Sequence, residues 1–532
     1  MPTVTEAIVE KLAGRGVHHI FGVPGGDCNL DFIAAAEAAG LTFVLTRTET
    51  AAVIMASVSA ELTGGIGVAM TTRGPGIAAA ANGVAYASLD RAPVLVIADG
   101  YETAQGFISH QRLDQVALMR PLTKRAARLS SSTALRQVDD CLQTMLSVPQ
   151  GPAYLEVAGS TIRGAASEAD AGPAPIAPPP ANPAAIARAR AMLAAARRPI
   201  VIAGLQARHQ GVPEALRAFI DQTSCPLLYT YKAKGVVSDD HPQVLGPYIG
   251  GVAEEDAVRR ADLAILVGFD PVEGPPQPWR YSLPLLEITE HRFDRPLFDA
   301  QVSVVASLPT ALRAIASRAT GTDWDADEIA SMKNGLRAAA RVAKGEGISP
   351  QDVVTEVQAA MPDDCRITVD AGAHMLPVMH LWKTRSPNGA LISRGLSTMA
   401  FALPAAIAAH LADPATPTVA FTGDGGLMMC TGELATAAQF GCKPIVVVFN
   451  DSSLTLIGAK QRRRQLTTAG VNFSSTDFAQ VARGFGWSGY RVTETRDLRA
   501  TIGRAIEAGG PALIDVVVDP HEYQDQIVSL RG

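Results

Sequence analysis

Asp424 and Asn450 are the side chains in this sequence whose types and positions best suit the binding of a hard metal cation. Asp424 lies within Gly423-Asp-Gly-Gly426, directly after the apolar segment at residues 418–422, and Asn450 ends the apolar segment at residues 445–449. If these segments are parallel strands joined by a helix, both side chains leave the same edge of a sheet, where open α/β folds bind ligands. A carboxylate and an amide carbonyl suit Mg²⁺, which takes its other ligands from phosphates and water.

Glu49 is a candidate for acid–base chemistry. It follows the apolar segment at residues 42–46 and precedes an expected helix over residues 50–60, so its carboxyl group should also lie at a sheet edge. Taken alone, a glutamate in this position is most often an ordinary negative charge at a helix N-terminus. Gly-Asp-Gly alone likewise fits an ordinary turn from a strand into a helix. Both functional assignments therefore depend on further evidence from the rest of the sequence.

Short apolar segments alternate with helical segments along most of the chain. Such segments are typical of strands that a parallel sheet buries on both faces, with helices covering the sheet. The sequence thus predicts an α/β protein with doubly wound parallel sheets. The expected strands lie at residues 17–21, 42–46, 67–72, 93–98, 199–203, 261–267, 366–369, 418–422 and 445–449.

The chain of 532 residues is long enough for about three domains. Residues 166–183 are rich in Pro and Ala and are expected to form an extended linker. We predict an N-terminal domain over residues 1–165, a central domain over residues 184–340 and a C-terminal domain over residues 341–532. The third domain repeats the scheme of the first, with an opening helix, a strand and glycine-rich turns.

The composition excludes several classes of function. A net charge of −6 gives no electrostatic footprint for nucleic acid. No apolar run is long enough to span a bilayer and no signal peptide is seen, so neither a membrane partner nor secretion is expected. The six cysteines are scattered, with no CxxC pair and no metal-ligand spacing. This pattern favours reduced thiols in a cytoplasmic protein.

The segment at residues 418–450 resembles the diphosphate-binding signature of thiamine diphosphate (ThDP) enzymes. Within it, Gly-Glu-Leu-Ala-Thr-Ala-Ala-Gln-Phe-Gly at residues 432–441 is similar to acetolactate synthases and their relatives, which include benzoylformate decarboxylase and benzaldehyde lyase. The resemblance covers nearly the whole chain. It implies a pyrimidine-binding N-terminal domain, a central domain and a diphosphate-binding C-terminal domain. It also implies Mg²⁺ bound by the Asp424 and Asn450 side chains and the backbone carbonyl of Ser452.

The same resemblance assigns further residues to the cofactor. Glu49 would hold the pyrimidine ring at N1′ and favour the tautomer that deprotonates thiazolium C2. Residues 395–406 resemble the family's GLGAMGFGLPAA, so Met399 would bend the cofactor and the Ser397 carbonyl would accept from its 4′-amino group. The loop at residues 370–374 would offer backbone donors to the diphosphate. The expected cofactor contacts are Glu49, Gly372, Ala373, His374, Ser397, Met399, Gly423, Asp424, Gly425, Gly426, Asn450, Ser452 and Leu454.

The expected substrate site consists of Gly26, Arg73, His110 and Gln111. Gln111 has the offset from Arg120-Pro-Leu-Thr-Lys124 that the active-site glutamine has in acetolactate synthases, whereas His110 stands where those enzymes have Phe. A histidine there could relay protons near neutral pH. Arg73 could bind a substrate carboxylate through two hydrogen bonds, or it could point outward. Asp27 is a further acid–base candidate, because its segment blends synthase and decarboxylase patterns.

The chain departs from acetolactate synthases in two places. Val267-Gly is followed by Phe-Asp-Pro-Val-Glu273, without the arginines of the family's FAD-contacting region, which argues against bound FAD. After Asn450 the chain has Asp-Ser-Ser-Leu454 in place of the usual Asn-Asn-Gly or Asn-x-x-Tyr-Gly. The extra carboxylate, Asp451, is expected to point to solvent.

The resemblance implies attack of the cofactor on a 2-oxo acid, cleavage of a C–C bond to give a cofactor enamine, and protonation or transfer to an acceptor. We expect a ThDP- and Mg²⁺-dependent decarboxylase or carboligase that works as a homodimer or homotetramer. Acetolactate synthase itself is the first alternative, followed by a 2-hydroxyketone lyase or hydrolase and a non-catalytic ThDP-binding subunit. A nicotinamide oxidoreductase shares the fold class, but no GxGxxG follows a strand.

Overall fold

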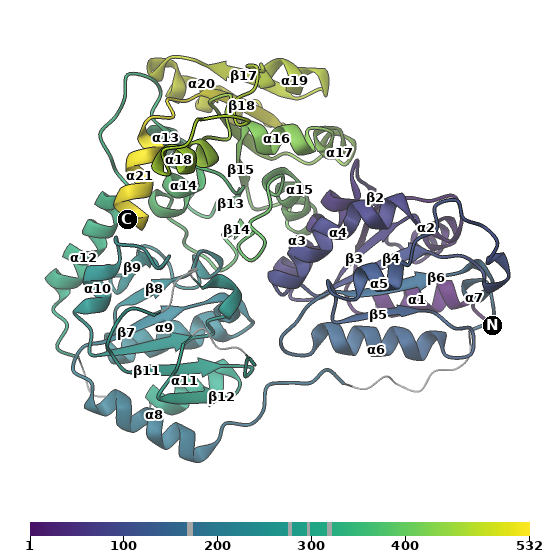
Figure 1. Cartoon of the computed structure of the whole chain (residues 1–532), viewed down its shortest axis with the longest axis horizontal. Coiled ribbons are helices and arrows are strands. Elements are labelled where there is room, and N and C mark those ends of the chain that lie inside the picture. The colour runs from purple at the N-terminus through teal and green to yellow at the C-terminus, as the bar shows by residue number, and fades with distance from the viewer. Residues whose placement is uncertain (167–173, 275–278, 295–297, 317–321) are drawn as a thin grey trace. The chain divides into compact units, whose positions relative to one another are not determined.

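The computed structural model describes residues 1–166, 174–274, 279–294, 298–316 and 322–532. These residues form three six-stranded sheets, in the N-terminal, central and C-terminal parts of the chain (Figure 1). All of the described strand pairs are parallel. The prediction of three doubly wound α/β domains is confirmed.

Contacts divide the chain into two compact units, which are described separately below. The first unit comprises residues 1–177, 395–415 and 429–443, and the second comprises residues 178–394, 416–428 and 444–532. The first therefore contains the N-terminal sheet together with two segments from the predicted C-terminal domain. The second contains the central and C-terminal sheets.

The N-terminal sheet has the strand order β2-β1-β3-β4-β6-β5. The chain order reverses between β1 and β3, and loops on either side of such a reversal leave a crevice at the carboxyl edge of the sheet. The predicted strands at residues 17–21, 42–46, 67–72 and 93–98 are all present within a residue or two. The strands are β1 (His19–Val23), β2 (Thr42–Leu45), β3 (Gly67–Thr71), β4 (Val94–Asp99), β5 (Arg125–Arg128) and β6 (Ala153–Val157).

Helices cover both faces of this sheet. On one face α1 (Val4–Ala13), α2 (Cys28–Ala38) and α6 (Ala134–Leu146) share an apolar core with the strands. On the other, α3 (Glu49–Thr63) and α4 (Pro75–Leu89) pack on each other and against β3. Three shorter helical segments are η1 (Thr103–Gln105), α5 (Gln115–Met119) and α7 (Gly159–Ile162).

Two helices from the C-terminal sequence also belong to the first unit. They are α15 (Ala402–Ala412), which packs on α3, and α17 (Glu433–Gln439), which packs on α15. Buried alanines line both α3 and α15, and such small side chains let two helices approach closely. The predicted boundary at residue 341 therefore does not separate the packing groups of this chain.

The central sheet has the order β12-β11-β10-β7-β8-β9, the arrangement of doubly wound dinucleotide-binding folds. Helices α8 (Pro183–Ala195), α9 (Val212–Thr223) and α11 (Leu308–Ala316) cover one face, while α10 (Glu255–Arg259) and α12 (Ala326–Ala339) cover the other. The strands are β7 (Pro199–Ala203), β8 (Leu227–Tyr229), β9 (Val244–Pro247), β10 (Leu263–Val267), β11 (Leu285–Thr289) and β12 (Val302–Val305). Short 3₁₀ segments are η2 (Leu205–Arg208), η3 (Tyr231–Ala233) and η4 (Pro271–Glu273).

The C-terminal sheet, β14-β13-β15-β16-β18-β17, repeats the strand order of the N-terminal sheet, as the sequence predicted. Its order reverses between β13 and β15. The strands are β13 (Arg366–Val369), β14 (Ala390–Ile392), β15 (Thr418–Gly423), β16 (Ile445–Asn450), β17 (Ser488–Val492) and β18 (Ala512–Val517). The helices are α13 (Pro350–Ala360), α14 (Met375–Leu381), α16 (Asp424–Cys430), α18 (Thr455–Arg463), α19 (Phe478–Gly484), α20 (Thr495–Glu507) and α21 (Glu522–Arg531).

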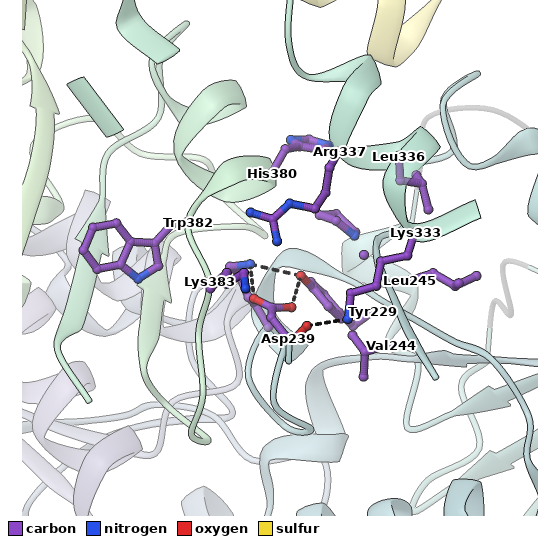
Figure 2. A pocket seen from close by; sticks show the side chains of 13 residues that line it. Tyr229, Asp239, Val244, Leu245, Lys333, Leu336, Arg337, His380, Trp382 and Lys383 are labelled. Atoms are coloured by element: carbon purple, nitrogen blue, oxygen red, sulfur yellow. Dashed lines mark hydrogen bonds and ion pairs between the residues drawn. The ribbon is translucent and has the colours of Figure 1, made fainter. Parts of the chain in front are cut away.

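Inside the second unit, a buried ion pair of the central part also contacts the C-terminal part; Figure 2 shows its carboxylate, Asp239. The Nζ atom of Lys234 lies 2.6 Å from Oδ2 of Asp239, and the Tyr229 hydroxyl donates to the other carboxylate oxygen at 2.6 Å. The backbone N–H of Thr384, from the C-terminal part, also donates to Asp239 at 2.8 Å. The cavity beside this pair has a volume of about 20 Å³, enough for one water molecule. The cluster is therefore structural.

The expected linker begins in residues that are only partly described, since residues 167–173 lie outside the described part. Residues 174–182 carry no helix or strand, and α8 begins at Pro183, capped by the Asn182 side chain. Within the described residues, no helix has both the length and the apolar character needed to cross a bilayer. All six cysteines are free and buried.

Candidate functional site

Three loops meet at the carboxyl edge of the C-terminal sheet. They follow β13, β15 and β16, which are neighbours in the sheet and parallel. The loops contain Asp370 to His374, Gly423 to Gly426 and Asn450 to Ser452, the predicted diphosphate and metal residues. The first two loops flank the point where the strand order reverses, which is where open α/β sheets bind ligands.

Asp424 is the buried carboxylate of this edge, with an exposed fraction of 2%. Its Oδ1 accepts a hydrogen bond from the Gly425 N–H at 2.7 Å, and its Oδ2 accepts from the N–H groups of Ser452 and Asp451 at 2.6 and 3.1 Å. Burial raises the pKa of this carboxyl, and the backbone donors oppose the rise. The contacts hold Asp424 against the loop that carries the other two predicted ligands.

The amide of Asn450 is oriented by a buried carboxylate. Its Nδ2 donates to Oδ1 of Asp515 at 2.8 Å and to the Thr476 carbonyl at 3.0 Å. Because a carboxylate and a carbonyl can only accept here, the Nδ2 side of the amide must face them. This leaves the carbonyl oxygen Oδ1 as the Asn450 atom that can bind a cation.

Asp515 was not predicted as a site residue. It is fully buried in β18 and also accepts from the Phe478 N–H at 3.1 Å and from Arg491 at 2.7 Å. Its sequence signal is a single acidic residue inside the apolar strand Ala-Leu-Ile-Asp-Val-Val. Such a residue needs buried partners, and here one of the partners is the predicted metal ligand Asn450.

The loop after Asn450 is held in a strained form. Ser452 has a φ of 55°, in the left-handed region that few non-glycine residues adopt. The next residue of the predicted set, Leu454, donates its N–H to the Val471 carbonyl at 2.8 Å.

The expectation that Asp451 points to solvent is wrong. Its carboxylate accepts from the Thr455 hydroxyl at 2.6 Å and the Ser453 N–H at 3.1 Å, and burial raises its pKa to about 6.

His374 lies at the centre of the predicted diphosphate site. Its ring is buried and stacks on Phe449 at 5.4 Å between centroids, and burial lowers its pKa to about 3, so the ring is neutral. Among the described residues, its Nε2 atom is buried without a hydrogen-bond partner. A buried nitrogen of this kind calls for a partner that the chain does not supply.

Glycines allow the loops to approach each other closely. A Cβ at Gly426 would lie 2.3 Å from Oδ2 of Asp370, and a Cβ at Gly372 would lie 2.6 Å from the His374 ring. A Cβ at Gly423 would likewise press on His374 at 3.3 Å. This glycine cradle, the unpartnered nitrogen and the set of hard oxygen atoms fit a diphosphate with a divalent cation.

Glu49 begins α3 in the first unit. The preceding residue, Thr48, caps the helix by accepting from the Ala51 N–H at 3.2 Å. Glu49 lines a cavity of about 460 Å³, and Met399 lines the same cavity. The structure thus brings together two residues that are 350 positions apart and that the sequence assigned to one cofactor. The remaining lining residues are Thr48, Thr50, Ala51, Ala79, Asn82, Thr398, Ala400, Met429 and Cys430.

The loop that carries Met399 is fixed on α4. The Gly395 N–H donates to the Asp90 carboxylate at 3.0 Å, and the Asn82 amide donates to the Thr398 hydroxyl at 3.0 Å. Ser397 is exposed and has a φ of 53°, while Ala400 has a φ of 64°. Two left-handed residues within four positions mark a loop that the surrounding structure holds in an unfavourable conformation, as binding loops often are.

Asp27 and Arg73 meet at the carboxyl edge of the N-terminal sheet, on either side of its strand reversal. Their side chains form an ion pair at 3.0 Å, and Arg163 binds the other Asp27 oxygen at 3.0 Å. Arg73 also donates to the Gly100 carbonyl at 2.7 Å and stacks on the Tyr101 ring at 4.5 Å. In this conformation both predicted residues are engaged by the protein itself.

Gln111, His110 and Gly26 are exposed at the same edge. Gln111 has a φ of 55° and lines a second cavity, of about 570 Å³, together with Tyr101 and Arg112. The His110 backbone carbonyl accepts from the Tyr101 hydroxyl. Open space surrounds the Cα of Gly26, so nothing in the chain fills the position of a side chain there.

Asp99 supports the turn with Gly25 and Asn29 at this edge, and it was not among the residues predicted from the sequence. It is fully buried at the end of β4 and accepts from the N–H and the Nδ2 of Asn29, at 3.1 and 2.7 Å. Asn29 in turn accepts from the Gly25 N–H at 2.7 Å, so Asp99 fixes the turn that precedes α2 through Asn29. Burial raises the pKa of Asp99 to about 6. An aspartate ending an apolar strand is the signal that could have identified it.

In the central sheet, the chain places a buried carboxylate beside the strand reversal between β10 and β7. The Glu273 carboxylate accepts from the Leu205 N–H at 2.6 Å and from the Thr230 hydroxyl at 2.5 Å. It is buried, and burial raises its pKa to about 7. The backbone donor after β7, which could face a dinucleotide phosphate, is therefore already occupied.

Three family models of thiamine pyrophosphate enzymes match this chain. The N-terminal TPP binding domain matches residues 2–118, the central domain matches residues 186–315, and the C-terminal TPP binding domain matches residues 370–516. Together these ranges include Glu49, Asp424 and Asn450.

Curated relatives align over nearly the whole chain. An acetolactate synthase of Bacillus subtilis is 27% identical over 539 residues, covering 98% of this chain and 94% of that protein. A probable 2-ketoarginine decarboxylase of Pseudomonas aeruginosa is 28% identical, covering 94% and 92%. A pyruvate oxidase of Lactiplantibacillus plantarum is also 28% identical, covering 96% and 88%.

The two glycine-rich sheet edges, the cavity shared by Glu49 and Met399, and the three matched domains in their order lead to one assignment. The chain belongs to the thiamine diphosphate-dependent enzymes, in the superfamily that includes the acetolactate synthases.

Proposed function

We propose that this protein is a ThDP- and Mg²⁺-dependent decarboxylase or carboligase of a 2-oxo acid. The observation that carries the proposal is the convergence of Asp424, Asn450 and Ser452 on one sheet edge, with Asn450 turned so that its carbonyl oxygen is available. Bound ThDP would serve as the electron sink when the bond between the keto carbon and the carboxylate breaks. Two of the relatives named above, the probable 2-ketoarginine decarboxylase and the pyruvate oxidase, act by their names on 2-oxo acids, which supports the substrate class.

Different residues of the chain would bind the metal, the cofactor and the substrate. Asp424, Asn450 and the Ser452 carbonyl would bind Mg²⁺, and the loops with Gly372, Ala373, His374, Gly423, Gly425 and Gly426 would hold the diphosphate. Glu49 would hold and release the proton at the pyrimidine ring, and Met399 would set the bend of the cofactor. Gln111 and His110, on the exposed loop, would contact the substrate, and Gly26 would leave space for it.

Two contacts in the central domain support a reaction without FAD. The Leu205 N–H donates to the Glu273 carboxylate, and a Cβ at Gly204 would lie 2.5 Å from the Phe269 backbone. We therefore propose a reaction in which no flavin takes part. This proposal differs from acetolactate synthase as the resemblance describes it, with a region that contacts FAD. Acetolactate synthase remains the second candidate, because relatives of that name align over almost the whole chain.

We further propose a cytoplasmic homodimer or homotetramer. The buried free cysteines suit a reducing compartment. Met428 and Met429, on the helix that begins with Asp424, are 54% and 58% exposed. Large exposed apolar side chains beside a polar site are typical of surfaces that another subunit covers. Light scattering coupled to size-exclusion chromatography would measure the assembly.

The function is tested by turnover with ThDP and Mg²⁺ on pyruvate and on branched, aromatic and acidic 2-oxo acids. CO₂ release and products should be followed together by NMR. An aldehyde or a mixed hydroxyketone would support the decarboxylase or carboligase, whereas acetolactate from pyruvate would favour the synthase. Binding of ThDP without conversion of any of these acids would contradict the proposal.

Glu49→Gln should lower turnover by a factor of roughly 100 or more, because the amide cannot exchange a proton with the pyrimidine ring. Binding of ThDP with Mg²⁺, followed by isothermal titration calorimetry, should remain. Glu37→Gln, the same change at an exposed position of α2, is the matched control and should leave both quantities unchanged. Full activity of Glu49→Gln would remove Glu49 from the mechanism.

A further inference from the structure

We propose that Glu433 is a positioning residue for Glu49. The proposal rests on the function proposed above, in which Glu49 handles the proton at the pyrimidine ring. Glu433 is the first residue of α17, its exposed fraction is 0%, and it lies in the same compact unit as Glu49. It belongs to the Gly-Glu-Leu-Ala segment noted in the sequence, to which no role was assigned.

The Glu433 carboxylate binds the two peptide groups that immediately precede Glu49. Its Oε1 accepts from the N–H groups of Arg47 and Thr48, both at 3.0 Å, and from the Thr48 hydroxyl at 3.2 Å. Its Oε2 lies 3.3 Å from the Arg47 N–H and accepts from the Thr436 hydroxyl at 2.8 Å. The carboxylate thus fixes the backbone of the turn between β2 and α3 rather than a distant side chain.

This turn determines where Glu49 points. Thr48 is the N-cap of α3, and its hydroxyl, while donating to Glu433, accepts from the Ala51 N–H. The first turn of α3, with Glu49 as its first residue, is therefore bound to Glu433 through Thr48. Withdrawing the carboxylate would leave two N–H groups unpaired in a partly buried turn and would free the turn to shift. A shift of about 1 Å in a catalytic group can cost about 100-fold in rate.

The electrostatics of Glu433 also distinguish it from an ordinary packing residue. Among the described residues no lysine, arginine or histidine forms an ion pair with it, so its charge is compensated only by N–H and O–H donors. Burying a carboxylate in this way is costly unless its hydrogen bonds are satisfied. Apart from the Thr436 hydroxyl of α17 itself, the donors all belong to the turn that precedes Glu49. The arrangement is suited to holding a backbone segment in one place.

The same helix supplies a matched control. Gln439, exposed at the other end of α17, accepts from the Arg47 guanidinium at 2.8 Å. Gln439→Ala therefore removes a contact between α17 and the same turn without releasing its peptide groups. Any general loosening of α17 would affect both variants, whereas a positioning role would affect only Glu433.

The experiment measures exchange of the C2 proton of ThDP for deuterium by NMR, in the full chain with Mg²⁺ and without substrate. Glu433→Asp keeps the charge but withdraws the oxygen atoms by one methylene group. It should slow exchange about 10- to 100-fold. The dissociation constant of ThDP should stay close to that of the parent, and the melting temperature should fall only modestly, because the change leaves only the two N–H groups of the turn unpaired. Glu433→Gln retains one acceptor oxygen and should give an intermediate rate, while Gln439→Ala should exchange like the parent.

Glu49→Gln is included as a reference that separates the two proposals. If Glu49→Gln exchanges at the parent rate, the role of Glu49 in the proposed function fails. If Glu49→Gln is slow and both Glu433 variants exchange at the parent rate, the positioning role of Glu433 fails alone. Should Glu433→Asp not fold, the folded Glu433→Gln variant decides, and a parent exchange rate in that variant overturns the proposal.

Discussion

At the scale of single residues, buried carboxylates recur wherever a loop of this protein must be held still. Asp424 binds the loop with Ser452, Asp99 binds the turn with Asn29, and Glu433 binds the turn before Glu49. Each carboxylate accepts backbone N–H groups from a loop at the carboxyl edge of a sheet. Such loops lack the hydrogen bonds of regular structure, so a buried acceptor stabilises one conformation of them.

The Asp515→Asn variant tests whether a residue behind the proposed metal site controls the orientation of the proposed ligand Asn450. An asparagine has one acceptor oxygen for three donors, so it should release or turn the Asn450 amide. The apparent affinity for Mg²⁺, measured by metal-dependent ThDP binding in a calorimeter, should fall by about 10-fold.

Asp477→Asn is the control for that measurement. Asp477 caps α19 and lies 4.0 Å from Arg491, which also contacts Asp515, yet it makes no described contact with Asn450. An equal loss of Mg²⁺ affinity in both variants would show a general effect on the loop. Unchanged Mg²⁺ affinity in Asp515→Asn would show that Asn450 keeps its orientation without it.

At the scale of elements, the position of Glu49 depends on how closely α3 and α4 pack. Gly83 of α4 faces α3, and a Cβ there would lie 2.7 Å from the Val53 Cβ and 2.8 Å from the Thr50 carbonyl oxygen. Thr50 follows Glu49 directly, so a displaced α3 would carry the Glu49 carboxyl group with it. The close approach of the two helices therefore requires glycine at this position.

Gly83→Ala and Gly335→Ala make the same chemical change with opposite expected results. Gly83→Ala should destabilise by about 1–3 kcal/mol through overpacking, and it should lower turnover. Gly335→Ala, in α12, meets no atom within 4 Å and should stabilise by about 0.5–1 kcal/mol through helix propensity. Melting temperatures from circular dichroism compare the two. A stable, fully active Gly83→Ala would show that α4 can shift without moving Glu49.

At the scale of the whole molecule, the buried pair of Lys234 and Asp239 connects two of the three sheets. Asp239 lies in the central part, and its carboxylate and its N–H both bond to the backbone of Thr384, which leads into β14. Lys234 has a side-chain exposure of 1%, and burial is the main cause that lowers its pKa. The pair is therefore one of the contacts between the central and C-terminal parts of the second unit, beside those of Asp240 with Lys383 and Arg385.

Lys234→Met should destabilise the protein by about 3–5 kcal/mol, because it leaves the Asp239 charge buried without a cation. Urea unfolding followed by circular dichroism would measure the loss. Arg259→Met is the control, since it breaks an exposed pair with Glu255 on α10 and should cost less than about 1 kcal/mol. Equal effects of the two substitutions would mean that the buried pair contributes no more than a surface one.

The predicted strands and the order of the three sheets along the chain follow from local sequence. Short apolar segments ending in Gly-rich turns predicted the buried parallel strands and placed Asp424 and Asn450 at one edge, because a parallel strand pair fixes where both ends lie. The same reasoning placed Glu49 at the end of β2 and the start of α3. These conclusions need only periodicity, turn residues and the resemblance carried by contiguous motifs.

What only the tertiary structure decided concerns side chains whose partners are far away in the chain. Glu433 binds Arg47 over 386 positions, Arg163 binds Asp27 over 136, and Asp515 binds Asn450 over 65. Asp451, expected in solvent, instead bonds to the start of α18. A local pattern specifies which backbone an element adopts, whereas the partner of a buried charge is set by how separate elements pack. The sequence alone therefore determined the sheet type and nine of the eighteen described strands, including the two that end at Asp424 and Asn450. The tertiary structure determined which charges hold the loops in place.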